Sequence, residues 1–466
     1  MKNKLLNMKS LIQILLCLSV AFAFYPACKP QQNRPNAVIE KGKVITEIKC
    51  AADTTVSYAL FLPYNYDNAS AWPVIIAFDP HAAGHLPVEL FAAEAGKCGF
   101  VVAGSNNSKN GMDFNQVTEI YKKMLSDLVS RFNIDTGCIY TLGFSGGGRI
   151  AGSLAMTERG ISGVVSCGAG LQATGQPPVQ PFSFLGVAGN GDFNWTELAI
   201  IDPQLEQAGF VHHFLDFSGK HEWPPSEILT QIMDWIQFDA MRKGKIPINR
   251  NAINRFIDQN DSIANLPYVA ENPYEQWKVY VKMKHYLQGL TDVSALEGML
   301  VRLEKDPVLK QKQQEIQEQI KLEQNRREHY ASMLPAPDPE FWKTESIKLR
   351  TLSQNMQENN NAQVYSRLLG FLSLSSYMYC NNALKQNNLE SAGKYVEIYG
   401  QVDPGNPEHQ YLAAIIAARK QNKHAVIKAL TSALELGFKD KARLMADPEF
   451  ADYHGKSEFE AILRQL

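Results

Sequence analysis

The sequence is poor in cysteine, and the spacing of its cysteines excludes a metal framework. Seven cysteines occur in 466 residues, and no two of them form a CxxC pair. With Cys17 and Cys28 near the N-terminus set aside, those left are Cys50, Cys98, Cys138, Cys167 and Cys380. This odd number predicts neither a zinc site nor a disulfide framework, although a single bridge stays open in an oxidising compartment. We expect most of these thiols to be buried as small apolar side chains.

The sequence also lacks an excess of either positive or negative charge. Lysine and arginine number 46 against 48 aspartates and glutamates, which gives a formal net charge of -2. Phosphate contacts need clustered cations, so we expect no nucleic acid as a partner. Neither a phosphate-binding loop, nor a dinucleotide fingerprint, nor zinc-ligand spacing occurs, so no cofactor and no metal are expected. The composition, with 45% hydrophobic residues, is that of a globular protein long enough for two domains or more.

Long hydrophobic runs are absent beyond the N-terminus. Three lysines among the first nine residues precede the apolar run 11–24, which is short for a bilayer span and typical of a secretory signal peptide. The run is closed by Tyr25-Pro26-Ala27-Cys28, an ending that resembles a bacterial lipoprotein cleavage box. We therefore expect a signal peptide over 1–28, a lipid on Cys28 and a polar tether over 29–42. Membrane attachment in the bacterial cell envelope follows, with simple secretion as the alternative.

Between residues 43 and 245, β-rich runs alternate with amphipathic helical stretches, which predicts a parallel sheet covered on both faces. The first two strands are joined by Asp53 and Thr54, and we expect them to form an antiparallel hairpin at one edge. The fold class is therefore α/β, with a doubly wound and mostly parallel sheet. Strands are predicted over 43–49, 56–62, 74–78, 100–104, 138–142, 163–167, 182–188 and 211–217.

After Lys243 glycine becomes sparse and strand-like runs disappear, which predicts an all-α region. Residues 246–360 are expected to form a helical linker region, with a long solvated helix over 306–328. Residues 361–466 are expected to form paired helices that resemble tetratricopeptide repeats. The resemblance rests on Ala392, Val396 and Pro404 in one unit and on Ala425, Ala429 and Leu430 in the next. Because stacked helix pairs form concave surfaces, the repeats imply a protein partner, with a purely structural role as an equal alternative.

The chemistry is concentrated in the segment Gly143-Phe144-Ser145-Gly146-Gly147. It lies between a predicted strand and a run compatible with a helix. A serine nucleophile needs such a sharp turn, because flanking glycines relieve the strained backbone while the hydroxyl is pushed into the open. The N–H of Gly146, at the start of the helix, is predicted to stabilise the developing oxyanion.

A serine hydroxyl also needs a base oriented by an acid. Asp192 follows the strand 182–188, and His221 follows the strand 211–217. This is the chain order that a strand-turn-helix serine requires, so Ser145, Asp192 and His221 are the predicted catalytic triad. Glu197, Asp202 and Asp216 compete for the role of the acid, but they fall inside a predicted helix or strand.

A second oxyanion donor is expected from the loop that follows the strand ending at Phe78. The candidates are the backbone N–H groups of His81 and Ala82. The alternative is that Asp79 to His81 form an ordinary turn with the His81 side chain facing solvent.

With these residues in view, the segment 43–243 resembles the α/β-hydrolase superfamily, in particular lid-poor esterases related to polyhydroxybutyrate depolymerases, feruloyl esterases and dienelactone hydrolases. The resemblance rests on the serine segment, on 189–192 and on 219–223. It implies cleavage of a carboxylic ester through an acyl-enzyme. Only 46 residues separate Ser145 from Asp192, which leaves no room for a cap domain, so a small-molecule or polysaccharide-linked ester is the expected substrate.

Two alternatives stay open. A serine peptidase would use the same triad, but it would need acidic residues that recognise a free α-amino group, and no such cluster is evident in the hydrolase half. A non-catalytic scaffold presenting the helical repeats is the other alternative.

Overall fold

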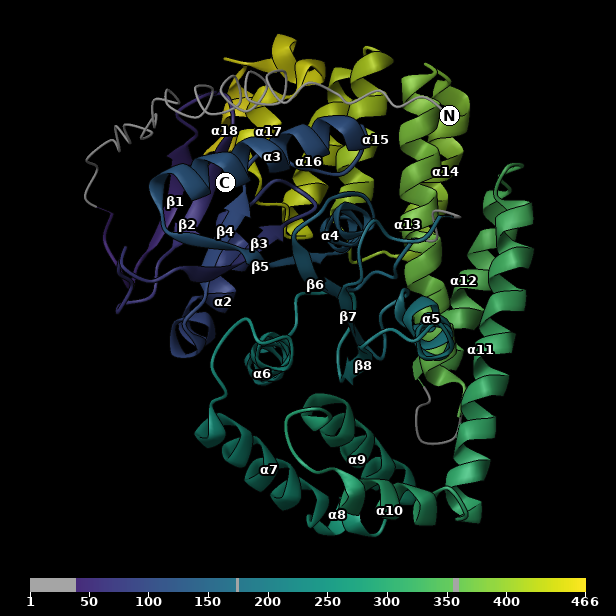
Figure 1. The fold of residues 1–466 in the computed structure, drawn as a ribbon. Helices are drawn as coiled ribbons and strands as arrows, with labels where there is room; N and C mark the ends of the chain where they lie inside the picture. Colours follow the sequence, from purple (N-terminus) through teal and green to yellow (C-terminus); the bar gives the residue numbers. More distant parts are fainter. Residues whose placement is uncertain (1–38, 173–175, 355–359) are drawn as a thin grey trace, which may run out of the picture. The chain divides into compact units, whose positions relative to one another are not determined.

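The computed structural model describes residues 39–172, 176–354 and 360–466 (Figure 1). The predicted signal peptide, the lipidation site at Cys28 and most of the tether lie outside the described residues. Within the described ranges, no helix combines the length and the apolar character that a bilayer crossing requires.

In the described part of the chain, eight strands form one sheet in the order β1-β2-β4-β3-β5-β6-β7-β8. The pairs β1–β2 and β2–β4 are antiparallel, and all other neighbours are parallel. This confirms the predicted mostly parallel α/β sheet and its edge hairpin. The strands are β1 (Val44–Lys49), β2 (Ser57–Phe61), β3 (Trp72–Phe78), β4 (Val101–Ser105), β5 (Ile134–Phe144), β6 (Ile161–Cys167), β7 (Ser183–Gly189) and β8 (His212–Phe217).

Helices cover both faces of this sheet (Figure 1). Every residue of β3, β4, β6 and β7 is buried, as expected for parallel strands between two helical layers. Helices α2 and α6 pack against each other, and α3 packs against α4. The five helices that alternate with the strands are α2 (His85–Cys98), α3 (Phe114–Arg131), α4 (Gly146–Thr157), α5 (Trp195–Gln207) and α6 (Ser226–Arg242).

The described chain beyond α6 is helical, which confirms the predicted all-α region. Its first members are α7 (Arg250–Ala264), α8 (Pro267–Ala270), α9 (Pro273–Leu287), α10 (Ser294–Leu303), α11 (Pro307–Met333) and α12 (Pro339–Gln354). They are followed by α13 (Ala362–Lys385), α14 (Leu389–Val402), α15 (Glu408–Arg419), α16 (Lys423–Glu435), α17 (Lys441–Ala446), the 3-10 helix η1 (Pro448–Tyr453) and α18 (Ser457–Leu463).

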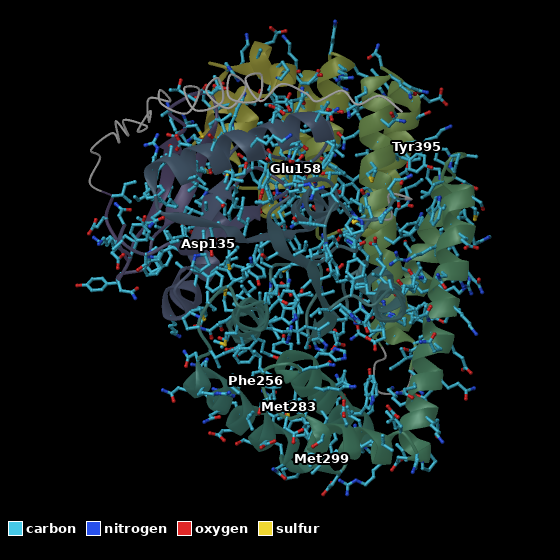
Figure 2. The ribbon with its side chains drawn as sticks, in the orientation of Figure 1. Asp135, Glu158, Phe256, Met283, Met299 and Tyr395 are labelled. Carbon is cyan, nitrogen blue, oxygen red and sulfur yellow. The ribbon has the colours of Figure 1, made fainter. Side chains whose placement is uncertain are left out.

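The start of the expected linker region shares the hydrophobic core of the sheet. Phe256 of α7 lies edge-on to Phe238 of α6, with ring centroids 5.3 Å apart, and stacks on Tyr286 of α9 at 5.1 Å. Phe256 and Met283 mark this layer in Figure 2. Arg242 of α6 donates to the backbone oxygens of His285 and Tyr286 at the end of α9. Helices α7 and α9 are therefore part of the sheet's own core.

A second core joins α11 to α18. Helix α11 is largely exposed, as expected for a solvated helix, but Ile320, Glu323 and Tyr330 on it are buried. Helix α11 packs against α9 and α13, which covers these residues.

The paired helices of the C-terminal region have matching turns. Helix α13 packs on α14, and α15 packs on α16. Asn387 and Gln421, 34 positions apart, both have a left-handed backbone, and each is followed by an asparagine that caps the next helix. A spacing of about 34 residues is that of a tetratricopeptide repeat. The repeat assignment stays a prediction, which these turns support.

None of the five cysteines in the described residues forms a disulfide. Four of them are buried and Cys98 is half-buried, in line with the expectation of small apolar side chains. Burial raises the pKa of Cys98 and of Cys138 to about 12, so both thiols stay protonated at neutral pH.

Candidate active site

The turn between β5 and α4 holds Ser145 in a strained backbone conformation. Its φ of 53° and ψ of -119° lie in a region that non-glycine residues rarely adopt. The turn is tight: a Cβ on Gly143 would lie 2.2 Å from the backbone of Gly147, and a Cβ on Gly147 would lie 2.1 Å from the Phe78 oxygen. The glycines are therefore needed for the close approach of strand, turn and helix. The Ser145 N–H donates to the Cys167 oxygen at 2.7 Å, which fixes the turn to β6.

The structure brings the three predicted side chains into one chain of hydrogen bonds. His221 Nε2 lies 2.9 Å from Ser145 Oγ, and His221 Nδ1 lies 2.9 Å from both carboxylate oxygens of Asp192. The three residues follow β5, β7 and β8, whose carboxyl ends meet at the same edge of the sheet. Asp192 is 1% exposed, so its carboxylate acts in a medium of low polarity.

The competing acids lie elsewhere. Glu197 receives two hydrogen bonds from the Arg149 guanidinium, at 2.9 and 2.8 Å. Asp202 lies 3.3 Å from His212 Nε2, and Asp216 Oδ1 lies 3.8 Å from Lys278 Nζ. Each of the three carboxylates thus has a partner of its own, and that partner is not His221.

Asp192 is held by neighbours that the sequence did not single out. The Asn194 N–H donates to Asp192 Oδ1 at 2.7 Å, and the Asn194 side chain donates to the Gly168 oxygen at 2.6 Å. Gly168 has a φ of +61°, and a Cβ on it would lie 2.9 Å from Asp192 Oδ2. The Gly168-Ala169-Gly170 segment directly after β6 was the available signal, since glycine after a parallel strand marks close backbone approach.

Aromatic rings enclose the imidazole of His221. The Phe193 centroid lies 4.2 Å from the imidazole centroid, and the Phe144 centroid lies 4.6 Å from it. Trp223 packs on Phe144 at 5.4 Å. Such packing restricts rotation of the imidazole, so it keeps Nε2 directed at Ser145.

The loop expected to supply the second oxyanion donor is closed by Asp79. The His81 N–H donates to Asp79 Oδ1 at 2.8 Å, and the Ala82 N–H donates to the Asp79 oxygen at 3.2 Å. Ala82 has a positive φ of 63°, and the His81 side chain is 84% exposed. Both expected donor groups thus have partners within the turn. The structure has the geometry of the alternative, a turn with His81 facing solvent, because the Asp79 carboxylate accepts the His81 N–H and the Asp79 backbone oxygen accepts the Ala82 N–H.

The Asn110 side chain lies over the start of α4, and sequence reasoning missed it. A Cβ on Gly146 would lie 1.7 Å from Asn110 Oδ1 and 3.2 Å from Asn110 Nδ2. The Asn110 N–H donates to the Pro80 oxygen at 2.9 Å, which ties this loop to the Asp79 turn. The N–H of Gly146, the first residue of α4, has no partner within the helix. An amide and a free helix terminus therefore meet beside Ser145.

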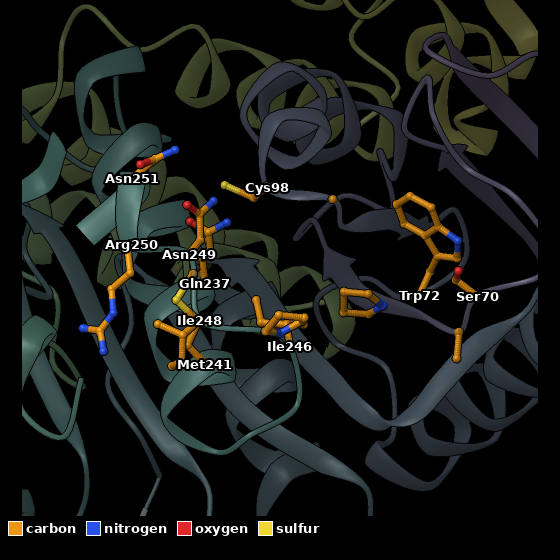
Figure 3. A pocket seen from close by; sticks show the side chains of 14 residues that line it. Ser70, Trp72, Cys98, Gln237, Met241, Ile246, Ile248, Asn249, Arg250 and Asn251 are labelled. Atoms are coloured by element: carbon orange, nitrogen blue, oxygen red, sulfur yellow. The ribbon is translucent and has the colours of Figure 1, made fainter. Parts of the chain in front are cut away.

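A cavity of about 630 Å³ lies away from these residues (Figure 3). It is lined by Trp72 and Pro73 at the start of β3, by Gly99, and by Ile246 and Asn249 beyond α6. β3 begins at the amino ends of the parallel strands, whereas Ser145 lies at their carboxyl ends. This cavity therefore cannot hold a group that Ser145 attacks. Over the described ranges, no three His, Cys, Asp or Glu side chains gather as a metal ion would need.

No family model matches the sequence, and no curated protein matches it. The chain is similar to the crystal structure of S-formylglutathione hydrolase (FrmB) from Staphylococcus aureus, at 13% identity and a TM-score of 0.33, over 39% of this chain and 90% of that one. It is also similar to an esterase from Pyrobaculum calidifontis, at 13% identity and a TM-score of 0.34, over 50% and 93%. Esterase 2 from Thermogutta terrifontis gives 13% identity and a TM-score of 0.33, over 44% and 96%. At such low identities and scores, the chemistry has to be inferred from the geometry of the site.

Proposed function

We propose that the protein is a serine hydrolase that cleaves a carboxylic ester through an acyl-enzyme. The observation that carries the proposal is the unbroken chain of contacts from the Asp192 carboxylate through both nitrogens of His221 to the Ser145 hydroxyl, with each step at 2.9 Å. A hydroxyl becomes a usable nucleophile at neutral pH only when a base stands within this distance.

The reaction follows from these positions. His221 Nε2 takes the Ser145 proton as Oγ attacks the ester carbonyl carbon, and Asp192 stabilises the resulting imidazolium at Nδ1. The imidazolium then gives its proton to the alcohol oxygen, so the alcohol leaves and the acyl group stays on Ser145. Water attacks the acyl-enzyme with the same base, which releases the carboxylic acid and restores the serine.

The oxyanion of each tetrahedral intermediate needs two donors. We assign the first to the N–H of Gly146, where the N-terminus of α4 also favours negative charge. We assign the second to the Asn110 amide, which lies at the start of α4, because the N–H groups of His81 and Ala82 are engaged with Asp79. Rotating the Asn110 amide by half a turn exchanges Oδ1 and Nδ2, so a donor can face the oxyanion.

The substrate class follows from the short connection between the nucleophile and the acid. Helix α4 and strands β6 and β7 account for most of the chain between Ser145 and Asp192, and all three belong to the sheet and its helical layers. An uncapped site suits an ester group at the end of a small molecule or a polysaccharide better than a long buried acyl chain. The sequence pattern ending at Cys28 further supports action at the bacterial cell envelope, through a lipid on that residue.

Ser145→Ala tests the proposal. Turnover of short aryl esters and of acetylated or feruloylated sugars should fall by about 10⁴-fold or more. Fluorophosphonate labelling should disappear with it. Ser153→Ala, a serine on the same helix α4, is the matched control and should change neither readout. Ester turnover within tenfold of the parent in Ser145→Ala would refute the assignment, and cleavage of aminopeptides alone would assign a peptidase instead.

A further inference from the structure

The loop that carries Asp192 is held from the C-terminal helical region at three points. We call residues 190–196 the acid loop. Arg367 Nη1 of α13 donates to the Asn190 oxygen at 2.8 Å. Arg327 Nη2 of α11 donates to the Phe193 oxygen. The Thr196 hydroxyl donates to Glu323 Oε2 of α11 at 2.7 Å. The points of attachment lie on both sides of Asp192.

These three contacts converge on one buried carboxylate. Glu323 is fully buried, and besides Thr196 it accepts from Arg367 Nε at 2.7 Å and from Arg327 Nη2 at 2.6 Å. The Arg367 guanidinium also lies over the ring of Trp195, 4.7 Å from its centroid. Helices α5, α11 and α13, which supply this cluster, run close together in Figure 1.

A charged cluster of this kind is a poor means of stabilising a fold. Removing two arginines and a glutamate from water is costly, and well-packed apolar side chains of similar volume often give equal or greater stability. The cluster instead holds the acid loop in one position, because its hydrogen bonds fix two backbone oxygens and one hydroxyl of that loop. Its best-attested use in proteins is to fix one arrangement among several.

The same helices also reach the imidazole through Phe193. The Phe193 ring lies against His221 on one side, at 4.2 Å between centroids. The same ring also packs on Gly370 of α13, where an added Cβ would lie 3.1 Å from Phe193 Cδ1. The helical region therefore contacts the acid loop on both sides of Asp192 and, through the Phe193 ring, reaches the base.

We propose that Glu323, Arg327 and Arg367 are positioning residues of the hydrolase, which hold the acid loop so that Asp192 faces His221 Nδ1 and Phe193 restrains the imidazole. The proposal rests on the proposed function, because it assigns the helical region a role in the same site. It gives α11 and α13 a task in catalysis that does not depend on any partner protein.

Glu323→Gln is the first test, since it keeps the shape and removes the charge on which both arginines converge. A misplacement approaching 1 Å costs about 10²-fold in rate. The value of kcat should therefore fall between tenfold and a hundredfold, while KM changes less than threefold. Thr196→Val, a milder change at the third contact, should lower kcat in the same sense. Arg367→Lys should keep part of the activity by retaining the charge.

Glu449→Gln is the matched control. Glu449 accepts from Arg419 Nε at 2.8 Å, and Arg419 also donates to a backbone oxygen, that of Leu384, within the helical region. Neither residue contacts the acid loop. This variant should lower the melting temperature and leave kcat unchanged. An equal loss of kcat in both variants would overturn the proposal, because general destabilisation would then explain it.

Two further readouts separate positioning from fold maintenance. In an Asp192→Asn background, Glu323→Gln should lower kcat by a smaller factor than it does in the parent, because the part of its effect that passes through Asp192 is already lost; an equal factor in both backgrounds would contradict the proposal. The proton between His221 Nδ1 and Asp192 should give a far-downfield NMR signal that broadens or vanishes in Glu323→Gln, and an unchanged signal would refute the inference. The NMR readout needs no turnover, so it decides the inference even if Ser145→Ala shows that the proposed function is wrong.

Discussion

Gly168→Ala perturbs the site by a single methyl group. The new Cβ would lie 2.9 Å from Asp192 Oδ2, 3.0 Å from Phe144 Cε2 and 3.2 Å from His221 Cε1. Ordinary contact begins at 3.4 Å, so the carboxylate, the ring and the imidazole would all have to retreat by a few tenths of an ångström. The substitution therefore displaces the Asp192 carboxylate and the His221 imidazole without removing any catalytic group.

The expected effect of Gly168→Ala has two parts, a loss of stability and a loss of rate. The backbone of residue 168 is left-handed, with a φ of +61°, and an alanine there costs about 1–2 kcal/mol of stability. Displacing the acid and the base has a separate effect on rate. If 1 Å costs about 10²-fold, a shift of about 0.5 Å costs roughly tenfold in kcat.

Gly209→Ala is the control that separates these parts. Gly209 has a φ of +72°, and an added Cβ would meet nothing within 4 Å. Thermal unfolding of both variants, together with kcat on a short aryl ester, forms the assay. We expect both to lose stability and only Gly168→Ala to lose about tenfold in kcat. A Gly168→Ala enzyme with the same kcat as Gly209→Ala would refute the reasoning that this contact sets the triad geometry.

Three other substitutions test the remaining features. Asn110→Ala should lower kcat by about 10²-fold with little change in KM if its amide donates to the oxyanion, and steady-state kinetics will check this. Asp239→Asn should cost about 3 kcal/mol in urea unfolding, because the fully buried carboxylate accepts from Tyr140 and Ser183 and is paired with Lys243 at 2.9 Å. Lys282→Met should stabilise the protein at pH 7, since burial lowers the pKa of Lys282 to about 8 and the unfolded chain holds this proton more tightly. The gain, on the order of 3 kcal/mol at most, should shrink between pH 8 and pH 10.5, which unfolding at pH 7 and at pH 10 will measure.

The sheet was predictable from the sequence because its strands are short apolar runs bounded by glycine and polar loops. The main miss was the start of β5, which begins at Ile134, before the predicted 138. Asp135 and Gly137 read locally as turn residues. In the fold, the pairing of Ile134 with Trp72 of β3 outweighs that preference.

The three candidate catalytic residues could be predicted from chain order, because each follows a recognisable strand. Their surroundings could not. Glu323 meets Thr196 across 127 positions of sequence, and no local pattern marks such a contact. The oxyanion loop shows the same limit, since Asp79 decides where the N–H groups of His81 and Ala82 point, and only the folded turn reveals it.

The core shared by the sheet and helices α7 and α9 decides where the chain can usefully be cut. A fragment ending at residue 245 would strip Phe238 of its Phe256 neighbour and leave Arg242 without the carbonyls at the end of α9. A fragment ending near Thr291 would keep those contacts and lose Glu323 and Arg367. A comparison of these two fragments would thus separate the contacts that the α/β unit needs for folding from the contacts proposed to position the Asp192 carboxylate.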